Sequence, residues 1–387
     1  MGEEELTLES VTVGGQPLLR PFIERLRLRP LLGEALGPVD RRLKLDPVDS
    51  ALLLVRNFAL ARHPLYGVPD WLRQFDPAQV ALTTEQMQLV NDDRLGRVLD
   101  RLFVADPRTL TTRIVVPMVA EFGIDLSRCH QDSTTVTFSG VYAAPPPRAD
   151  RRRRLRIVHG HNKDHRPDLK QLVWSLTVSA DGAVPVHYNV YDGNRTDDQL
   201  HVDTWEALRR VVGSPDFIYV ADCKLCTRDN MAHLDHAGGR FITVLPRSRK
   251  EDARFRAYLV EHAVDWQVVC QRPPRRRQSD PQECFEAVEA TEPTVEGYRL
   301  VWYRSSDKWQ RDQQHRDHAI QTARQQLERL RERTGRRTLK TADQVRAAAD
   351  RILADTETGD WIQVHLVPRE KHDHQQAGPG RPGLHTR

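Results

Sequence analysis

Two aspartates stand where paired carboxylates could do chemistry in this 387-residue sequence. Asp132 lies inside a β-branched run, residues 129–138, and Asp222 directly follows an apolar run, residues 217–221. Carboxylate oxygens are the ligands that Mg²⁺ prefers, with waters or substrate phosphates at its remaining positions. Two such ions about 4 Å apart can activate a water or a 3′-hydroxyl and stabilise the departing oxygen of a phosphodiester. The alternative for an Asp at a strand end is a turn or cap residue, so the case depends on topology and position together.

The segments around the two aspartates predict a mixed sheet. Alternating and β-branched runs predict strands, and an apolar stripe at i, i+3 and i+4 predicts the first helix between them. Thr227 is a plausible N-cap for the second helix. The expected elements are strands 129–138, 171–178 and 184–190, helix 199–212, strand 217–221, a helix from Thr227, and strand 240–245. This β-β-β-α-β-α-β order is that of a ribonuclease-H-like sheet, in which the middle of strand one and the end of strand four lie side by side.

The rest of the chain predicts further domains around this α/β core. Helices are expected at residues 48–61, 71–75 and 91–103, and later ones at 308–333 and 341–352, with strands at 297–304 and 361–367. The Gly- and Pro-rich tail, residues 372–387, has the composition of a linker. The expected order is a helical N-terminal domain (1–125), the ribonuclease-H-like core (126–250), an inserted α/β region with a long polar helix (251–354), and a strand with a Gly/Pro-rich tail (355–387). The N-terminal domain could read DNA ends, pair protomers or be a structural cap.

Composition excludes some classes of protein. The net charge is modest, +4, because 58 Lys and Arg residues stand against 54 Asp and Glu residues. No apolar run is long enough to span a bilayer, and the N-terminus has no secretion signal pattern. Five scattered cysteines, an odd number, predict a reduced cytoplasmic protein rather than a disulfide framework. Cys223 and Cys226 form a single C-x-x-C without a second pair, which argues against zinc.

Basic side chains are concentrated locally. The runs Arg151–Arg156 and Arg272–Arg277 could form phosphate-binding patches or be solvated loops. His159, His161 and His165 could suggest a metal cluster, but a basic loop facing phosphates explains them equally well. Cationic and imidazole side chains of this kind fix a nucleic acid backbone without reading its sequence. The predicted phosphate contacts are Lys163, His165, Arg166, Lys170, Lys224, Arg228 and Arg247.

Several motifs resemble the DDE-superfamily transposases of bacterial insertion sequences, in the large group with an inserted ribonuclease-H-like core. The matching stretches are residues 64–66 (PLY), 91–97 (NDDRLGR), 131–134 (QDST), 160–171 (GHNKDHRPDLKQ), 221–231 (ADCKLCTRDNM) and 239–247 (GRFITVLPR). The resemblance implies a cut-and-paste recombinase, a homodimer on double-stranded DNA in the bacterial nucleoid, that binds terminal inverted repeats. It implies two Mg²⁺ or Mn²⁺ ions, with Asp132 and Asp222 as the first and second catalytic acids.

The third acid of the family is a Glu on a helix within a Tyr…Arg…Glu…Lys pattern, and this chain departs from that pattern. The glutamates in the corresponding part of the chain, none of them in such a pattern, are Glu283, Glu286, Glu289, Glu296 and Glu370. We therefore expect a family member truncated before its third ligand. Two functions stay open: a transposase completed by Glu370 or by a residue outside the chain, and a DNA-binding remnant without chemistry. An unrelated metal-dependent nuclease on the same fold is a third alternative.

Overall fold

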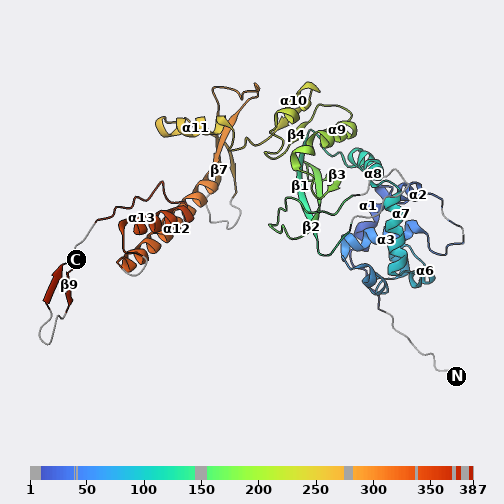
Figure 1. Cartoon of the computed structure of the whole chain (residues 1–387). Coiled ribbons are helices and arrows are strands. Elements are labelled where there is room, and N and C mark those ends of the chain that lie inside the picture. The colour runs from blue at the N-terminus through green and yellow to red at the C-terminus, as the bar shows by residue number, and fades with distance from the viewer. Residues whose placement is uncertain are drawn as a thin grey trace. The chain divides into compact units, whose positions relative to one another are not determined.

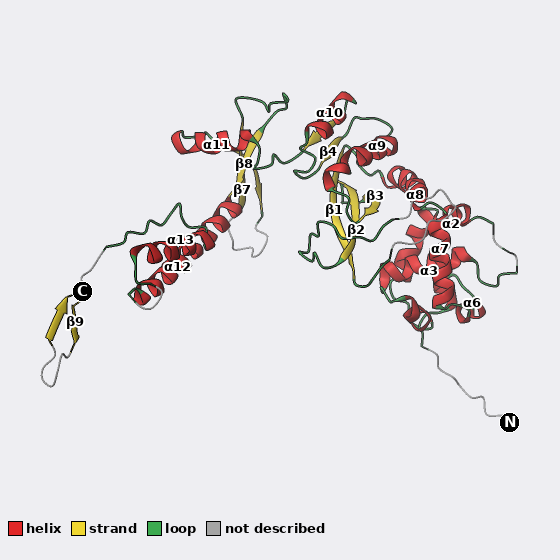
Figure 2. Cartoon of the chain, in the orientation of Figure 1, coloured by secondary structure: helices red, strands yellow, loops and turns green. Residues whose placement is uncertain are grey.

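The computed structural model divides into two compact units, Met1–Ala253 and Arg254–Arg387, each of which is described by itself (Figures 1 and 2). The residues that the structure describes are 10–38, 40, 42–143, 155–273, 282–335, 339–367, 372–375 and 383–386. Most of each arginine-rich run, residues 151–156 and 272–277, lies outside these ranges, as does Glu370.

The first unit begins with helices. They are α1 (Gln16–Arg25), α2 (Leu28–Leu36), α3 (Pro47–Leu60), η1 (Leu65–Gly67), α4 (Val68–Leu72), α5 (Pro77–Val80), α6 (Thr84–Gln88), α7 (Asp92–Val104) and α8 (Pro107–Phe122). Asn91 caps α7 by accepting a hydrogen bond from the Arg94 amide at 2.9 Å, which confirms the helix predicted at 91–103. The helix predicted at 71–75 is wrong in its bounds, because α4 ends at Leu72 and the chain turns there. Leu53, Leu72 and Leu95 are almost fully buried in the core of this bundle.

A five-stranded mixed sheet follows, as the alternating sequence pattern predicts. Its strands are β1 (Arg128–Phe138), β2 (Lys170–Ser179), β3 (Pro185–Asp192), β4 (Ile218–Val220) and β5 (Arg240–Ile242), in the order β3-β2-β1-β4-β5. β2 is antiparallel to both β1 and β3, whereas β4 is parallel to β1 and to β5. The chain is therefore a mixed α/β protein, with β1 at the centre of its largest sheet.

Two helices connect the parallel strands and supply the apolar core beside them. They are α9 (His201–Val212), which follows the short turn η2 (Asp197–Gln199), and α10 (Arg228–His236). Thr227 caps α10 as predicted, accepting from the Asn230 amide at 3.3 Å. Trp205 of α9 is fully buried and packs on Phe217, with ring centroids 6.2 Å apart. Glycine is required at position 239, because a Cβ there would lie 2.6 Å from the Trp205 ring. This packing fixes β4 and β5 beside β1.

The second unit holds a three-stranded antiparallel sheet and a helix pair. Its elements are the end of α11 (Lys250–Glu261), β6 (Gln267–Arg272), β7 (Glu283–Glu289), β8 (Val301–Ser305), α12 (Ser306–Arg333), α13 (Ala342–Asp355), β9 (His372–Gln375) and β10 (Gly383–Thr386). α11 and β6 have no clear signal in the sequence. The helices predicted at 308–333 and 341–352 are confirmed, and Leu330 and Ala349 form their buried contact.

Three predictions in this unit are wrong. Residues 361–367 form no strand: Val364 packs against the α12–α13 core, and its carbonyl accepts from Arg346 at 2.8 Å instead of from a strand. The strand expected at 297–304 begins only at Val301, after a turn closed by the Gly297 amide bonding to the Thr294 carbonyl at 2.8 Å. Within the predicted linker, β9 and β10 pair as an antiparallel hairpin, because backbone groups can form a ladder whatever the composition of the side chains.

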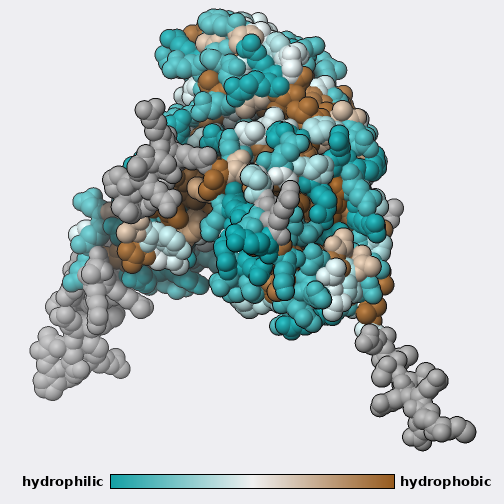
Figure 3. Space-filling view, turned by 90° about the vertical axis from the view of Figure 1, so that its right-hand side faces the viewer, coloured by the Kyte–Doolittle hydropathy of each residue, from teal (hydrophilic) through white to brown (hydrophobic). Residues whose placement is uncertain are grey.

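Hydrophilic residues cover most of the molecular face seen in Figure 3, and apolar residues appear between them in separate groups. This agrees with the mean hydropathy of −0.61. Within the described ranges, no helix combines the length and the apolar character that crossing a membrane requires.

Candidate active site

Asp132 lies within β1, and Asp222 follows the end of the neighbouring strand β4 by two residues. The parallel pairing of β1 and β4 matches Arg128 with Ile218 and continues residue by residue to His130 with Val220, where β4 ends. Because side chains two positions apart on a strand share one face, the Asp132 carboxylate follows the face on which His130 lies. The sheet therefore places side by side the two strands beside which the sequence-distant acids occur.

The two carboxylates face solvent and keep oxygen atoms available. The Asp132 side chain is 85% exposed, and its Oδ1 accepts a hydrogen bond from the Ser133 amide at 2.7 Å. Asp222 is also exposed; its Oδ1 accepts from the Lys224 amide at 2.9 Å, and its carbonyl accepts from Thr243 at 2.6 Å. Oδ1 of Asp222 thus stabilises a turn, which is the role that the alternative interpretation assigns to an Asp at the end of a strand. Its Oδ2 has no hydrogen-bond partner in the described part of the chain.

Lys163 joins the site from the loop that precedes β2. Its Nζ lies 3.7 Å from Asp132 Oδ1 and 3.4 Å from Asp197 Oδ2. The same ammonium donates to the backbone carbonyl of Ser133 and, at 3.0 Å, to the Ser133 hydroxyl. An ammonium has three hydrogens to donate, so these contacts together occupy its hydrogen-bond donors. Lys163 therefore fixes the strand beside Asp132, and it ties Asp197 of η2 to the same place.

Beneath the carboxylates lies a buried imidazole. His201, at the start of α9, is 1% exposed, and its Nδ1 lies 3.1 Å from the Tyr219 hydroxyl. Its Nε2 has no hydrogen-bond partner among the residues that the structure describes. Burial lowers the pKa of His201, while the negative charges of Asp222 and Asp197 oppose that shift. Burial likewise raises the pKa of Tyr219 well above its usual value. The pair is neutral and supplies no charge that competes with a cation at the carboxylates.

Asp197 and His201 were not predicted as site residues from the sequence. His201 lies within the predicted helix 199–212, and Asp197 lies two residues before it. The available signal was the acidic pair Asp197-Asp198 directly before the predicted helix, where acidic residues are usually explained by the helix dipole. Their proximity to Asp132 and Asp222 arises only when the sheet forms.

The loop between β1 and β2 is built by residues of the GHNKDHRPDLKQ motif. The buried amide of Asn162 donates to Gln171 Oε1 at 3.0 Å, and Asn162 Oδ1 accepts from the Asp164 amide at 2.7 Å. Gln171 in turn donates to the Gly193 carbonyl at 2.7 Å. A Cβ on Gly160 would lie 2.0 Å from that same Gly193 carbonyl, so only glycine fits there. These residues set the backbone from which Lys163 reaches Asp132.

The seven predicted phosphate contacts divide into two groups. Three are held by the protein itself: Lys163 as above, Arg166 by Asp168 through bonds of 2.9 and 2.7 Å, and Lys170 by the Val141 carbonyl and, at 3.0 Å, the Tyr142 carbonyl. The other four have exposed side chains without an ion pair within the described ranges: His165, Lys224, Arg228 and Arg247. Two of these, Lys224 and Arg228, follow Asp222 closely along the chain.

Carboxylates are the groups of the candidate site that could hold a metal ion. Among the described residues, no group of three or more His, Cys, Asp or Glu side chains is arranged to hold one. Exposed carboxylates such as those of Asp132 and Asp222 are the kind of ligand that Mg²⁺ and Mn²⁺ take together with waters or phosphate oxygens. Neither Cys223 nor Cys226 is part of a disulfide.

The glutamates considered for a third ligand have other partners. Glu286 and Glu289 lie on β7 of the second unit, where Arg304 binds the first at 2.6 Å and Arg299 the second at 2.7 Å. Glu283, on the same strand, is buried and accepts from Ser305 at 3.1 Å. These pairs hold β7 and β8 together.

Comparison with known proteins gives one family match. Residues 9–116, which contain α1–α7 and part of α8, match a family described as a domain of unknown function, DUF4277. No curated protein matches the chain.

Solved structures give weak likenesses. A Mos1 transposase paired-end complex with left transposon end is 13% identical, with a TM-score of 0.21 over 57% of this chain and 68% of that one. A Mos1 mariner paired-end complex with Mn is 14% identical, with a TM-score of 0.20 over 64% of this chain and 77% of that one. At TM-scores this low the likeness carries no weight, and the function has to follow from the residues of this chain.

Proposed function

We propose that this chain is a DNA transposase of a bacterial insertion sequence, which cleaves and joins DNA strands at terminal inverted repeats. The observation that supports the proposal most is the parallel pairing of β1 with β4, because Asp132 lies within β1 and Asp222 follows the end of β4 by two residues. The sheet order β3-β2-β1-β4-β5 supports a ribonuclease-H-like core at residues 126–250. The motifs around both aspartates, which resemble those of the DDE superfamily, point to the same chemistry.

In this proposal each residue of the site has a defined task. Asp132 and Asp222 supply the oxygen ligands for two Mg²⁺ or Mn²⁺ ions. Bound there, the ions supply an activated water or 3′-hydroxyl and stabilisation of the departing oxygen. Lys163 keeps Asp132 in place, and the four exposed donors, His165, Lys224, Arg228 and Arg247, bind backbone phosphates of the DNA. The helical part, residues 1–125, binds DNA ends or pairs two protomers on them, and residues 251–354 are an insertion in the core.

A second candidate function is DNA binding without catalysis. It is favoured because, within the described ranges, no group of three or more His, Cys, Asp or Glu side chains is arranged to hold a metal ion. Two carboxylates place a cation less firmly than three, which costs part of the electrostatic stabilisation of a phosphoryl transition state. The exposed basic side chains would serve binding equally well in both functions.

A gel shift combined with a cleavage assay separates the two functions. The purified chain is incubated with DNA that carries the inverted repeats flanking its gene, with Mn²⁺ or with EDTA. The enzyme produces a shift in both conditions and cleavage only with Mn²⁺, whereas a DNA-binding protein produces the shift alone. Asp132→Asn and Asp222→Asn should each abolish cleavage and keep the shift. Asp235→Asn, an exposed residue of α10, is the matched control and should cleave normally. Cleavage that survives in Asp132→Asn would refute the assignment of the site.

A further inference from the structure

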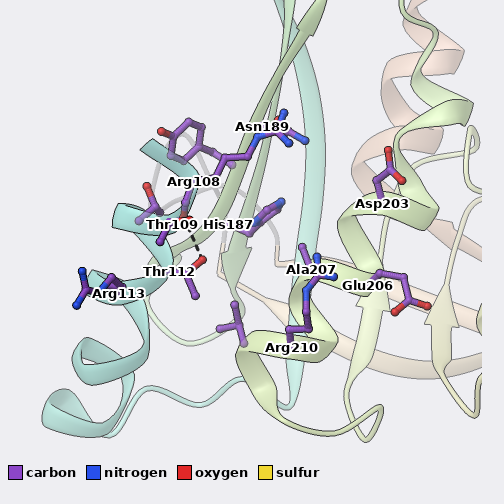
Figure 4. Close-up of a pocket in the computed structure, with 13 residues that line it drawn as sticks. Arg108, Thr109, Thr112, Arg113, His187, Asn189, Asp203, Glu206, Ala207 and Arg210 are labelled. Carbon is purple, nitrogen blue, oxygen red and sulfur yellow. Dashed lines mark hydrogen bonds between the residues drawn. The ribbon is translucent and has the colours of Figure 1, made fainter. Parts of the chain in front are cut away.

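A polar cavity lies in the first unit, and neither aspartate of the candidate active site is among its lining residues. It has a volume of about 610 Å³ and opens between α8, β3 and α9. Figure 4 shows its lining, with Arg108 and Arg113 on α8, His187 on β3 and Arg210 on α9. Cavities of about 300–1,000 Å³ are the usual size for sites that bind small molecules.

The charges around this cavity are unbalanced. Arg108 and Arg210 have exposed side chains and no ion-pair partner among the described residues. Arg113, in contrast, pairs with Glu34. The two guanidinium groups approach the cavity from different helices, so no single helix explains their positions.

The acidic residues of the lining do not cancel these charges. Glu206 binds His233 at 3.0 Å and lies 3.8 Å from Arg209. In Figure 4, the carboxylates of Glu206 and Asp203 both point away from His187. Both carboxylates of the lining are therefore directed away from the part of the cavity where His187 lies (Figure 4).

His187 is the imidazole of the cavity lining. Burial lowers the pKa of its imidazole to about 4, and the charges of Arg108 and Arg210 contribute to the shift. The imidazole is therefore neutral at pH 7, when it can donate a single hydrogen bond. The lining thus combines two guanidinium groups, which have no ion-pair partner among the described residues, with an imidazole that can donate a hydrogen bond.

We propose that this cavity binds a phosphate group, held by the guanidinium groups of Arg108 and Arg210 with His187 as a neutral hydrogen-bond donor. Guanidinium forks match phosphate oxygens in geometry, and such charge-assisted bonds are stronger than neutral ones. The phosphate belongs either to a DNA backbone or to a free nucleotide. Binding here is independent of any chemistry at Asp132 and Asp222.

Arginine modification of the unaltered full-length protein tests the proposal. The chain is treated with phenylglyoxal in chloride buffer, and again with inorganic phosphate, ADP or duplex DNA at equal ionic strength, and modified peptides are quantified by mass spectrometry. Arg108 and Arg210 should be modified at least fivefold more slowly with an anion present, while Arg20 and Arg73, which are paired with Glu24 and Asp70, keep their rates. Protection by phosphate and ADP identifies a free ligand, and protection by DNA alone identifies a backbone phosphate. Equal protection of Arg20 and Arg73, or none at Arg108 and Arg210, overturns the proposal.

Variants give an independent measurement. Calorimetric titration with the anion that protects the wild-type protein should show at least tenfold weaker binding for Arg108→Gln and for Arg210→Gln. Arg113→Gln is the matched control, because its guanidinium already pairs with Glu34, and its affinity should change less than twofold. Thermal melting verifies that each variant is folded. Equal losses in all three folded variants would show a general charge effect and refute the site.

Discussion

Lys163 Nζ lies between two carboxylates, 3.7 Å from Oδ1 of Asp132 and 3.4 Å from Oδ2 of Asp197. Asp132 and Asp197 belong to β1 and to the turn before α9, so the lysine joins two elements that the chain separates by the whole β2–β3 hairpin. The Lys163 side chain was expected to contact DNA phosphates, and the structure shows it contacting the protein. Its role in the proposed chemistry is therefore to position Asp132.

Lys163→Met should slow Mn²⁺-dependent cleavage by about 10- to 100-fold, because small displacements of a reacting group cost rates of this order. DNA affinity should change less than threefold. Asp197→Asn, which removes only the Lys163–Asp197 ion pair, should slow cleavage less, and the double variant should be no slower than Lys163→Met, which already removes that pair.

Lys224→Ala is the matched control for Lys163→Met, because its exposed ammonium is a proposed phosphate contact. It should weaken DNA binding and reduce the dependence of log affinity on log salt concentration by about 1. If Lys163→Met reduces that slope instead and leaves the cleavage rate of bound DNA unchanged, Lys163 is a phosphate contact after all.

Gly160→Ala should destabilise the first unit by about 3 kcal/mol, the cost of forcing an extra group into a filled space. Its Cβ would lie 2.0 Å from the Gly193 carbonyl and 2.6 Å from Gln171 Nε2, a hydrogen-bonded pair that cannot move aside freely. Urea unfolding followed by tryptophan fluorescence measures the change.

Gly96→Ala provides the opposite expectation in the same assay. Gly96 lies inside α7, and a Cβ there meets nothing within 4 Å. Alanine in an open helical position should stabilise the unit by about 0.5–1 kcal/mol. Equal effects of the two substitutions would show that the Gly160–Gly193 contact is looser than described.

The stability of the first unit should depend on pH through His187, whose folded-state pKa of about 4 lies below its usual value of 6.5. As pH falls below 6.5, His187 binds a proton in the unfolded chain but not in the folded one. The contribution of His187 to the free energy of unfolding therefore decreases between pH 6.5 and about pH 4 and stays constant at lower pH. The contribution is at most about 3 kcal/mol. His187→Gln should remove it, so the difference in unfolding free energy between pH 7 and pH 4 becomes smaller than in the wild type. An unchanged difference would contradict the assignment.

Cysteine alkylation should follow burial. Cys129 on β1 is fully buried, and this burial raises the pKa of its thiol to about 11, whereas Cys270 on β6 is exposed. Since the thiolate is the reactive form, iodoacetamide at pH 8 should label Cys270 in the native protein and Cys129 only after denaturation. Peptide mass spectrometry of timed samples measures both, and rapid native labelling of Cys129 would show that β1 opens locally.

Local physical signals determined much of the secondary structure from the sequence alone. Thr227 caps its helix as predicted, because a side-chain oxygen three residues from a free amide needs no distant partner. Alternation over β1, β2 and β3 likewise indicated one buried face on each strand. The same reasoning placed Asp132 inside a strand and Asp222 at the end of another.

Only the tertiary structure decided which residues meet. Residues 361–367 have a strand-like pattern but form no strand, since the space beside Val364 is occupied by two helices rather than by a sheet edge. Asp197 and His201 reach the carboxylates through the packing of α9, which no local pattern encodes. Strand register and helix packing depend on contacts between residues far apart in the chain. For that reason the sequence could propose the two acids and Lys163, whereas the contacts of Lys163 with Asp132 and Asp197, and the buried position of His201, follow only from the fold.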